Sequence, residues 1–368
     1  MSVVIEASAL RKEFMVRVRT GRLRRTRRTV TAVDGIDLVV ERGELLGYIG
    51  PNGAGKSTTL KMMTGILTPS GGSVRVCGLA PVPQRRRLAR RIGVVFGQRS
   101  LLWWDLPLRE SFELLRHIYQ VPAADHAARL RLCRQRLELD GFLDVPVRQL
   151  SLGQRMRGEI TAALLHGPEV LFLDEPSIGL DLVSREAVRG FIAELGARGD
   201  TTVVLTTHDL NDIERLCRRL VVIDRGRVVH DGSLESLHER YGSTRRVVVD
   251  LDEPLAVPVE LPGVTLVDTA AQGRRLTFSL DGVGAGALVA RLAAVATLRD
   301  LSVVEPAIET VVARLYTAGE RDAAGSRPSG PATREEGPGP GQPAATDAEP
   351  GPGCSRRASS PAPGPTAG

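Results

Sequence analysis

The stretch Gly50-Pro51-Asn52-Gly53-Ala54-Gly55-Lys56-Ser57-Thr58 follows the apolar run Leu45–Ile49 and precedes a helix-like segment, Thr59–Gly65. It fits the pattern G-x-x-x-x-G-K-[ST], in which glycines let backbone N–H groups surround phosphates, the lysine reaches the β- and γ-phosphates, and the serine hydroxyl ligates Mg²⁺. The alternative is a plain glycine-rich turn from a strand to a helix, but a preceding strand and a following helix are the context that a phosphate loop requires. The stretch therefore predicts a nucleoside triphosphate site.

Length and composition set broad limits on the chain. Its 368 residues fit about two domains with appended segments, because single cores rarely grow beyond roughly 250–300 residues. The net charge of +6 suits anionic partners such as nucleotides, lipid headgroups or nucleic acid, without choosing among them. The four cysteines are far apart and predict reduced cytosolic thiols. Neither a signal peptide nor a membrane-spanning apolar window is recognisable, which predicts a chain that does not cross a membrane unaided.

The order of apolar runs predicts an α/β fold with a largely parallel core sheet. Between the strand candidates 92–96 and 170–173 the pattern turns helical from Pro107, with Pro122, Pro146 and Pro168 as breaks. Other strand candidates are 3–10, 30–33, 36–40, 45–49, 73–77, 202–206, 220–223 and 227–229. A dense arginine run lies between Arg17 and Arg28. A solvated loop is favoured for it, with contact to an anionic membrane surface or an acidic partner as the alternative.

Composition also divides the chain into three parts. Residues 1–242 hold the phosphate loop, and residues 243–318 show alternating strand patterns with helices at 285–295 and 306–316, which predicts a small α+β domain. From Gly319 onward the chain has no Leu, Ile, Val, Met or aromatic residue. Such a segment buries too little apolar surface to offset its ordering entropy, so residues 319–368 are expected to be a disordered tail.

Two further segments carry the chemistry of phosphate transfer. The apolar strand candidate 170–173 delivers Asp174 and Glu175 at its carboxyl end, where Asp174 is suited to hold Mg²⁺ with Ser57 and Glu175 to orient and deprotonate water. The segment Leu150-Ser151-Leu152-Gly153-Gln154 precedes a helix. Ser151 is a good N-cap, and a serine hydroxyl, a glycine and free helix N–H groups also make an anion site, so both interpretations remain open.

Taken together, these motifs resemble those of ABC-transporter ATPases over about Val3 to Leu237. The resemblance rests on six segments in the family's order and approximate spacing: 50–58, Gln98, 150–154, Asp174-Glu175, Gly179-Leu180-Asp181 and Thr206-Thr207-His208. It implies a phosphate-loop ABC ATPase cassette with a parallel core sheet, an antiparallel β subdomain and a helical insertion. Two departures are visible, since Leu152 replaces a frequent glycine and Ser177 a usual threonine. We expect the side chain of Leu152 to point away from the phosphate.

The resemblance also implies roles for single residues. Phe14 is similar to the aromatic residue that stacks on adenine, and Gln98 to the glutamine that senses Mg²⁺ and the attacking water. Ser151, Gly153 and Gln154 would contact the γ-phosphate of an ATP held by the phosphate loop of a second ATPase subunit, identical or paralogous. Asp181 would lie at that dimer contact, and His208 would hydrogen-bond the γ-phosphate.

The function implied is that of an ATP-hydrolysing subunit of a bacterial ABC exporter. It would work with transmembrane permease subunits on separate chains, at the cytoplasmic face of the membrane, and no nucleic-acid partner is expected. Trp103 and Trp104 follow Gln98, in the region where such ATPases receive a permease helix, although core packing is an equal alternative for each. The segment 98–107, together with residues 150–157 and the small C-terminal domain, is similar to ATPases of multidrug and viologen-type exporters and, more loosely, of daunorubicin-type exporters. The alternative function is a soluble ABC ATPase acting on nucleic acid or ribosomes.

Overall fold

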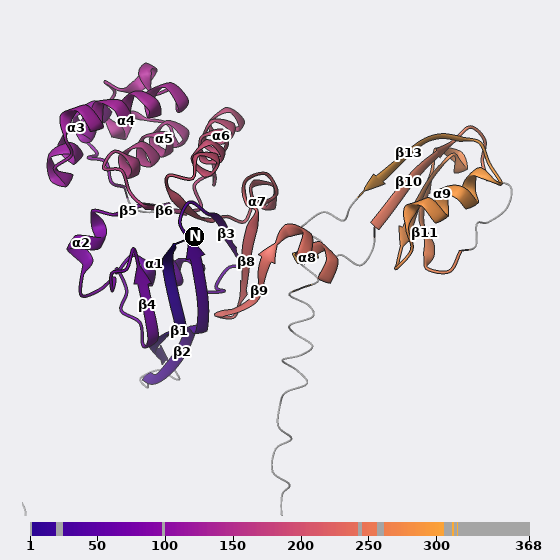
Figure 1. Ribbon diagram of the computed structural model, residues 1–368, viewed down its shortest axis with the longest axis horizontal. Helices are drawn as coiled ribbons and strands as arrows, with labels where there is room; N and C mark the ends of the chain where they lie inside the picture. Colours follow the sequence, from indigo (N-terminus) through magenta and orange to yellow (C-terminus); the bar gives the residue numbers. More distant parts are fainter. Residues whose placement is uncertain are drawn as a thin grey trace, which may run out of the picture. The chain divides into compact units, whose positions relative to one another are not determined.

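The computed structural model describes residues 2–19, 25–97, 100–241, 245–255, 261–304, 311–312 and 315. Within these residues the chain forms three β-sheets, two of them associated with the phosphate loop and the third built from residues after 244 (Figure 1). Of the helices in the described ranges, none is both long and apolar enough to span a bilayer.

The central six-stranded sheet has the strand order β5-β6-β7-β3-β8-β9 and is parallel except for its last strand. Its interior strands read as unbroken apolar runs because both faces are covered, and β3, β6 and β7 are buried along their whole length. The bounds are β3 Leu45–Ile49, β5 Ile92–Phe96, β6 Val170–Asp174, β7 Thr202–Thr206, β8 Arg219–Asp224 and β9 Arg227–Ser233. The parallel core predicted from the sequence is thereby confirmed.

A three-stranded antiparallel sheet packs against this core through a second apolar cluster that contains Ile5, Leu10 and Val33. Its strands are β1 Val3–Arg19, β2 Arg25–Glu41 and β4 Gly71–Val76, in the order β2-β1-β4. The strands β1 and β2 form one long hairpin.

The arginine run belongs largely to this hairpin, so the favoured solvated loop is wrong for the part that the structure describes. Arg17 lies directly across from Arg27, and Val16 from Arg28, while residues 20–24 lie outside the described ranges. The alternation of valine and arginine from Val16 to Arg19 is a strand pattern that the charge density obscured. Like charges that face each other across a strand pair are destabilising, so the backbone pairing holds despite them.

Helices cover the other face of the core and form the insertion between β5 and β6 (Figure 1). Pro107 and Pro122 stand immediately before α3 and α4, where a missing N–H costs nothing, as the sequence predicts. The helices are α1 Lys56–Met63, α2 Arg85–Ala89, α3 Leu108–Tyr119, α4 Ala123–Arg136, α5 Leu152–Leu164, α6 Leu182–Arg198, α7 Leu210–Leu216 and α8 Leu234–Tyr241, with 3₁₀ turns at Asp140–Phe142 and Val147–Gln149.

The third sheet is antiparallel, with the order β11-β12-β10-β13, and its core includes Val247, Phe278 and Leu292. Its elements are β10 Arg245–Leu251, β11 Val264–Ala270, the 3₁₀ turn Ala271–Gly273, β12 Arg275–Leu280, α9 Ala285–Ala293 and β13 Leu298–Val304. The α+β character expected here is therefore present. Of the helix expected at 306–316, residues 311, 312 and 315 are described and helical, and the segment 319–368 lies outside the described residues.

Candidate nucleotide-binding site

The phosphate loop connects β3 to α1, and two of its glycines have steric reasons to be glycine. Gly55 precedes α1 with a φ of 107°, and a Cβ there would lie 2.5 Å from the carbonyl oxygen of Ala32. A Cβ on Gly50 would lie 2.9 Å from Cγ1 of Ile223. The loop is thus held between the end of β8 and the hairpin strand β2. Helix α1 begins at Lys56, three residues before the start predicted from the sequence.

Lys56 is the buried cation of this loop. Its Nζ donates to the carbonyl oxygens of Gly50 at 2.6 Å and Pro51 at 3.3 Å. Burial lowers the pKa of its ammonium group, and the carboxylates of Glu175 and Asp174 oppose that shift. A cation with carboxylates nearby at the N-terminus of a helix is the arrangement that phosphate-loop enzymes use to grip phosphates beside a metal ion.

Asp174 stands at the carboxyl end of β6, where strand β7 and the start of helix α1 each deliver a hydroxyl group to the same carboxylate oxygen. Oδ1 of Asp174 accepts a hydrogen bond from Oγ1 of Thr206 at 2.6 Å and from Oγ of Ser57 at 3.3 Å. The register of the parallel strands brings Thr206 opposite Asp174. The structure thus brings together Ser57 and Asp174, which the sequence assigned to one metal ion, from segments more than a hundred residues apart.

Glu175 follows in an unusual backbone conformation, with a φ of 58°. Its amide donates to the carbonyl oxygen of Thr206 at 3.0 Å, and its Oε2 lies 2.9 Å from Nε2 of His208. Burial raises the pKa of its carboxyl group, and His208 and Lys56 counteract that effect. A carboxylate with a raised pKa is a stronger proton acceptor than an ordinary glutamate, which suits general-base chemistry.

The segment 150–154 forms the N-terminus of α5 as a capping box. The amide of Gln154 donates to Oγ of Ser151 at 3.2 Å, and the amide of Ser151 donates to Oε1 of Gln154 at 2.9 Å. The N-cap interpretation of Ser151 is therefore confirmed. Leu152 is 42% exposed, and its Cδ2 would lie 3.1 Å from a Cβ built on Gly179.

The N-terminus of α6 lies against that of α5. Asp181 caps α6 by accepting from the amide of Ser184 at 2.9 Å, and hydrogen bonds from Ser184 lower the pKa of the Asp181 carboxyl group. A Cβ built on Gly153 would lie 3.1 Å from Oδ2 of Asp181. The two helix starts, which the sequence placed at one subunit contact, are thus neighbours within the chain.

Phe14 lies on β1 opposite Val30 and is 37% exposed, with Nζ of Lys12 at 5.2 Å from its ring centroid. Ala32, two residues further along β2, is the residue whose carbonyl approaches the phosphate loop at Gly55. Two residues of a strand span roughly 7 Å, which puts Phe14 and Val30 one strand repeat from Ala32, and stacking of Phe14 on adenine stays a prediction.

Gln98 lies outside the described residues, so its placement stays a prediction. The residues around it line a cavity of about 430 Å³ that includes Phe96, Trp104, Arg155 and Glu159. Trp103 is 37% and Trp104 54% exposed, and the Arg155 guanidinium lies 5.9 Å from a ring centroid of Trp104. Complete burial in the core, the alternative for each tryptophan, does not apply to either.

Three hydrogen bonds around the site are not predicted by the sequence motifs. Thr206 belongs to a recognised segment, but its bond to Asp174 depends on strand register. Ser177 is buried and its Oγ donates to Oδ2 of Asp212 at 2.7 Å, while Nε of Arg189 donates to Oδ1 of Asp212 at 2.7 Å. This network connects the segment after Glu175 to the helix after His208. No local sequence pattern predicts it.

Comparison with known proteins agrees with this geometry. The family model described as "ABC transporter" matches residues 33–178. The Nod factor export ATP-binding protein I of Cupriavidus metallidurans is 36% identical over 262 residues, covering 68% of this chain and 86% of that relative. The ABC transporter ATP-binding protein NatA of Bacillus subtilis is 33% identical over 213 residues, covering 58% and 86% respectively.

Solved structures give the same result. One described as the ATP-binding subunit of an ABC transporter superimposes with a TM-score of 0.56 at 26% identity, covering 65% of this chain and 93% of that one. A dimeric ATP-binding cassette in a post-hydrolysis state, bound to ADP and Pi, gives a TM-score of 0.54 at 26% identity, covering 62% and 98%. The protein therefore belongs to the ABC transporter family, as an ATP-binding and ATP-hydrolysing subunit.

Proposed function

We propose that this ATPase hydrolyses ATP at sites shared between two subunits and thereby drives export through separate permease chains. The observation that carries the catalytic part is the convergence of Lys56, Ser57, Asp174, Glu175 and His208 at one edge of the core sheet. In this assignment the loop Gly50–Thr58 and Lys56 hold the phosphates, and Phe14 stacks on the adenine.

A magnesium ion fits this donor set. Ser57 and Asp174 present oxygen atoms 3.3 Å apart, and hydroxyl, carboxylate and water oxygens are the ligands that Mg²⁺ takes beside nucleotide phosphates. We assign Ser57, Asp174 and Gln98 as its holders, and the ion would neutralise charge on the phosphate oxygens.

Glu175 is assigned as the group that accepts the proton of the attacking water. Its raised pKa suits it to that task, and we assign His208, whose Nε2 lies 2.9 Å from Oε2 of Glu175, to orient it and to hydrogen-bond the γ-phosphate of bound ATP. The oxygen of water then bonds to the γ-phosphorus, the bond to the β–γ bridging oxygen breaks, and ADP and phosphate leave.

The second subunit completes the site. Ser151, Gly153 and Gln154 stand at the start of α5, where free N–H groups and the positive end of the helix dipole favour an anion. We assign them to the γ-phosphate held by the opposite subunit, with Asp181 at the contact between subunits. Loss of the γ-phosphate then removes the ligand that both halves share, and the halves separate.

The permease is expected to dock at the cavity beside Trp103 and Trp104. Exposed tryptophans next to a cavity are typical anchors for a partner helix, and Gln98 lies in the same segment, which links docking to the nucleotide. Relatives named for Nod factor export support the direction of transport. The protein would then act at the cytoplasmic face of a bacterial membrane.

Co-purification tests this function. A tagged wild-type chain is extracted with detergent from membranes of its own cells, and the bound chains are identified by mass spectrometry. We expect polytopic chains with the wild type, their loss with Trp104→Ala, and their retention with Val39→Ala, which removes another exposed apolar side chain. Equal recovery with all three proteins would contradict docking at Trp104. ATPase activity stimulated by RNA, with steep salt dependence, would instead support the nucleic-acid alternative.

A further inference from the structure

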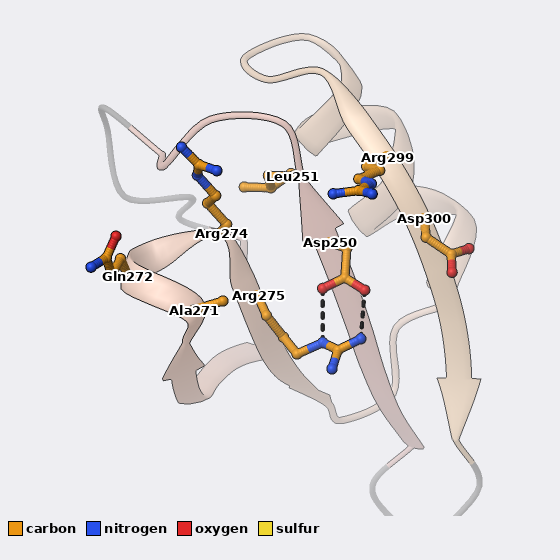
Figure 2. A pocket seen from close by; sticks show the side chains of 8 residues that line it. All are labelled: Asp250, Leu251, Ala271, Gln272, Arg274, Arg275, Arg299 and Asp300. Carbon is orange, nitrogen blue, oxygen red and sulfur yellow. Dashed lines mark hydrogen bonds and ion pairs between the residues drawn. The ribbon is translucent and has the colours of Figure 1, made fainter.

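The third sheet carries a hollow of about 620 Å³ that the ATPase chemistry does not use (Figure 2). It lies on strands β10, β12 and β13 and the 3₁₀ turn between β11 and β12. Its lining is formed by Asp250, Leu251, Ala271, Gln272, Arg274, Arg275, Arg299 and Asp300. The volume is within the range of roughly 300–1,000 Å³ that small-molecule sites occupy.

Two of the charged side chains that line this hollow form an ion pair with each other. Arg275 on β12 lies directly across from Asp250 on β10, and its Nε and a terminal nitrogen donate to the two carboxylate oxygens at 2.7 and 2.6 Å (Figure 2). Such a bidentate pair uses the donors that point at the carboxylate and leaves no net charge. Asp250 and Arg275 therefore form a neutral part of the lining.

Two more guanidinium groups line the hollow, from Arg274 and Arg299. Neither has an ion-pair partner among the described residues, and both side chains are exposed. In the view of Figure 2, the buried Leu251 lies between them. Asp300 is the remaining acid of the lining, and one of its oxygens already accepts from the amide of Leu301 at 2.8 Å. Three arginines and two aspartates leave this lining with a net positive charge.

Irregular segments of the backbone determine where Arg274 and Arg299 lie. Asp250 pairs with Asp300 and Leu251 with Leu298, so Arg299 is the extra residue of a β-bulge. Bulges redirect a side chain and recur next to functional sites. Arg274 follows Ala271, Gln272 and Gly273, whose φ angles of 51°, 56° and 87° are all left-handed. The amide of Leu251 donates to the carbonyl oxygen of Arg274 at 2.7 Å and holds this turn in place.

A left-handed conformation at two successive residues other than glycine costs free energy, and structures retain such strain mainly where it serves a site. From this strain, the bulge and the two guanidiniums that have no carboxylate partner in the described part of the chain, we propose that the hollow binds a small molecule bearing phosphate or carboxylate groups. The planar forks of Arg274 and Arg299 match both kinds of oxyanion, whereas the buried Leu251 belongs to the apolar core of the third sheet. The site does not depend on the proposed permease or on the subunit contact.

Calorimetric titration of the full chain tests this proposal. A Lys56→Ala background suppresses phosphate binding at the nucleotide loop, and pyrophosphate and citrate serve as the two probes. We expect saturable binding of at least one probe, weakened at least about tenfold by Arg274→Gln and by Arg299→Gln, because a charge-assisted hydrogen bond contributes that much affinity. Arg246→Gln, which removes an exposed arginine of β10 outside the lining, should leave the affinity unchanged.

The two probes distinguish between the two classes of ligand. Binding of pyrophosphate alone identifies a phosphate-bearing ligand, and binding of citrate alone a carboxylate-bearing one. Absence of binding for both probes overturns the proposal, as does binding that Arg274→Gln and Arg299→Gln leave intact or that Arg246→Gln weakens equally. Because all three arginines are exposed, their variants are expected to melt within a few degrees of the parent, and melting curves verify that each chain is folded.

Discussion

A Cβ atom built on Gly153 would lie 2.6 Å from Cβ of Ser184, so the start of α5 touches the start of α6 with no room for a methyl group. Ser184 is also the residue whose amide donates to the capping carboxylate of Asp181. The glycine is therefore required by packing inside one subunit, in addition to any contact that it makes with a nucleotide.

Gly153→Ala is expected to lower the free energy of unfolding by about 1–3 kcal/mol, the usual cost of an overpacked buried position. Thermal denaturation measures this loss. Ser184→Gly in the same chain should restore part of it, because it removes the opposing atoms. The matched control is Gly190→Ala on α6, where a Cβ meets nothing within 4 Å, and it should raise stability slightly. A destabilised Gly190→Ala chain, or a lack of rescue by Ser184→Gly, would refute this packing argument.

Glu175→Gln is expected to retain ATP binding and to reduce hydrolysis by orders of magnitude, because an amide cannot accept the proton of water. Nucleotide affinity by fluorescence titration, phosphate release and dimer formation in size-exclusion chromatography give the three readouts, and ATP should trap the variant as a dimer. Glu214→Gln, at an exposed glutamate of α7, should behave as the wild type. Unchanged turnover of Glu175→Gln would remove this residue from its assigned role.

Thr206→Val should weaken Mg²⁺ binding by about tenfold or more, because it deletes the hydrogen bond that orients Oδ1 of Asp174. The Mg²⁺ dependence of ATP hydrolysis at fixed ATP measures the effect. Thr202→Val removes a buried hydroxyl at the other end of β7, which accepts from the amide of Gly43 at 2.9 Å. It should cost stability without changing the Mg²⁺ requirement, and equal shifts in both variants would argue against an orienting role.

Acid sensitivity is expected from His166. Its ring stacks on Tyr119, Nε2 lies 2.9 Å from the carbonyl oxygen of Ile92, and burial lowers its pKa from 6.5 to about 4. Between pH 6.5 and 4 the unfolded chain therefore binds a proton at His166, whereas the folded chain does not. The contribution of His166 to the free energy of unfolding falls over this range by on the order of 3 kcal/mol. Urea denaturation at a series of pH values measures the fall. His166→Gln cannot titrate and should flatten it, whereas a slope equal to that of the wild type would exclude His166 as the cause.

Much of the catalytic assignment was accessible from the sequence because its signals are local. The loop 50–58, the strand ending in Asp174 and the capping box at Ser151 each lie within a few residues, and their chemistry depends on spacing along the chain. The strands 92–96 and 202–206 were predicted with their observed bounds for the same reason, since an apolar run between turn residues is a local pattern.

The hairpin of β1 and β2 shows where a prediction of secondary structure from local sequence fails. Charge density from Arg17 to Arg28 favoured a loop, yet the backbone continues as β1 and β2 because pairing with a partner strand satisfies its N–H and C=O groups along the whole length. Whether a segment finds such a partner is decided by a distant part of the chain. The bulge at Arg299 escapes the sequence for the same reason, because it exists only relative to the register of β10.

The sequence alone predicted a phosphate site and assigned to it one lysine, one serine and two carboxylates, since those groups are set by short motifs. Only the tertiary structure decided that Thr206 holds Asp174, that Gly153 must clear Ser184, and that Arg274 and Arg299 line one hollow. Each of these contacts joins segments whose proximity follows from sheet register or helix packing, and neither is encoded in the spacing of residues along the chain.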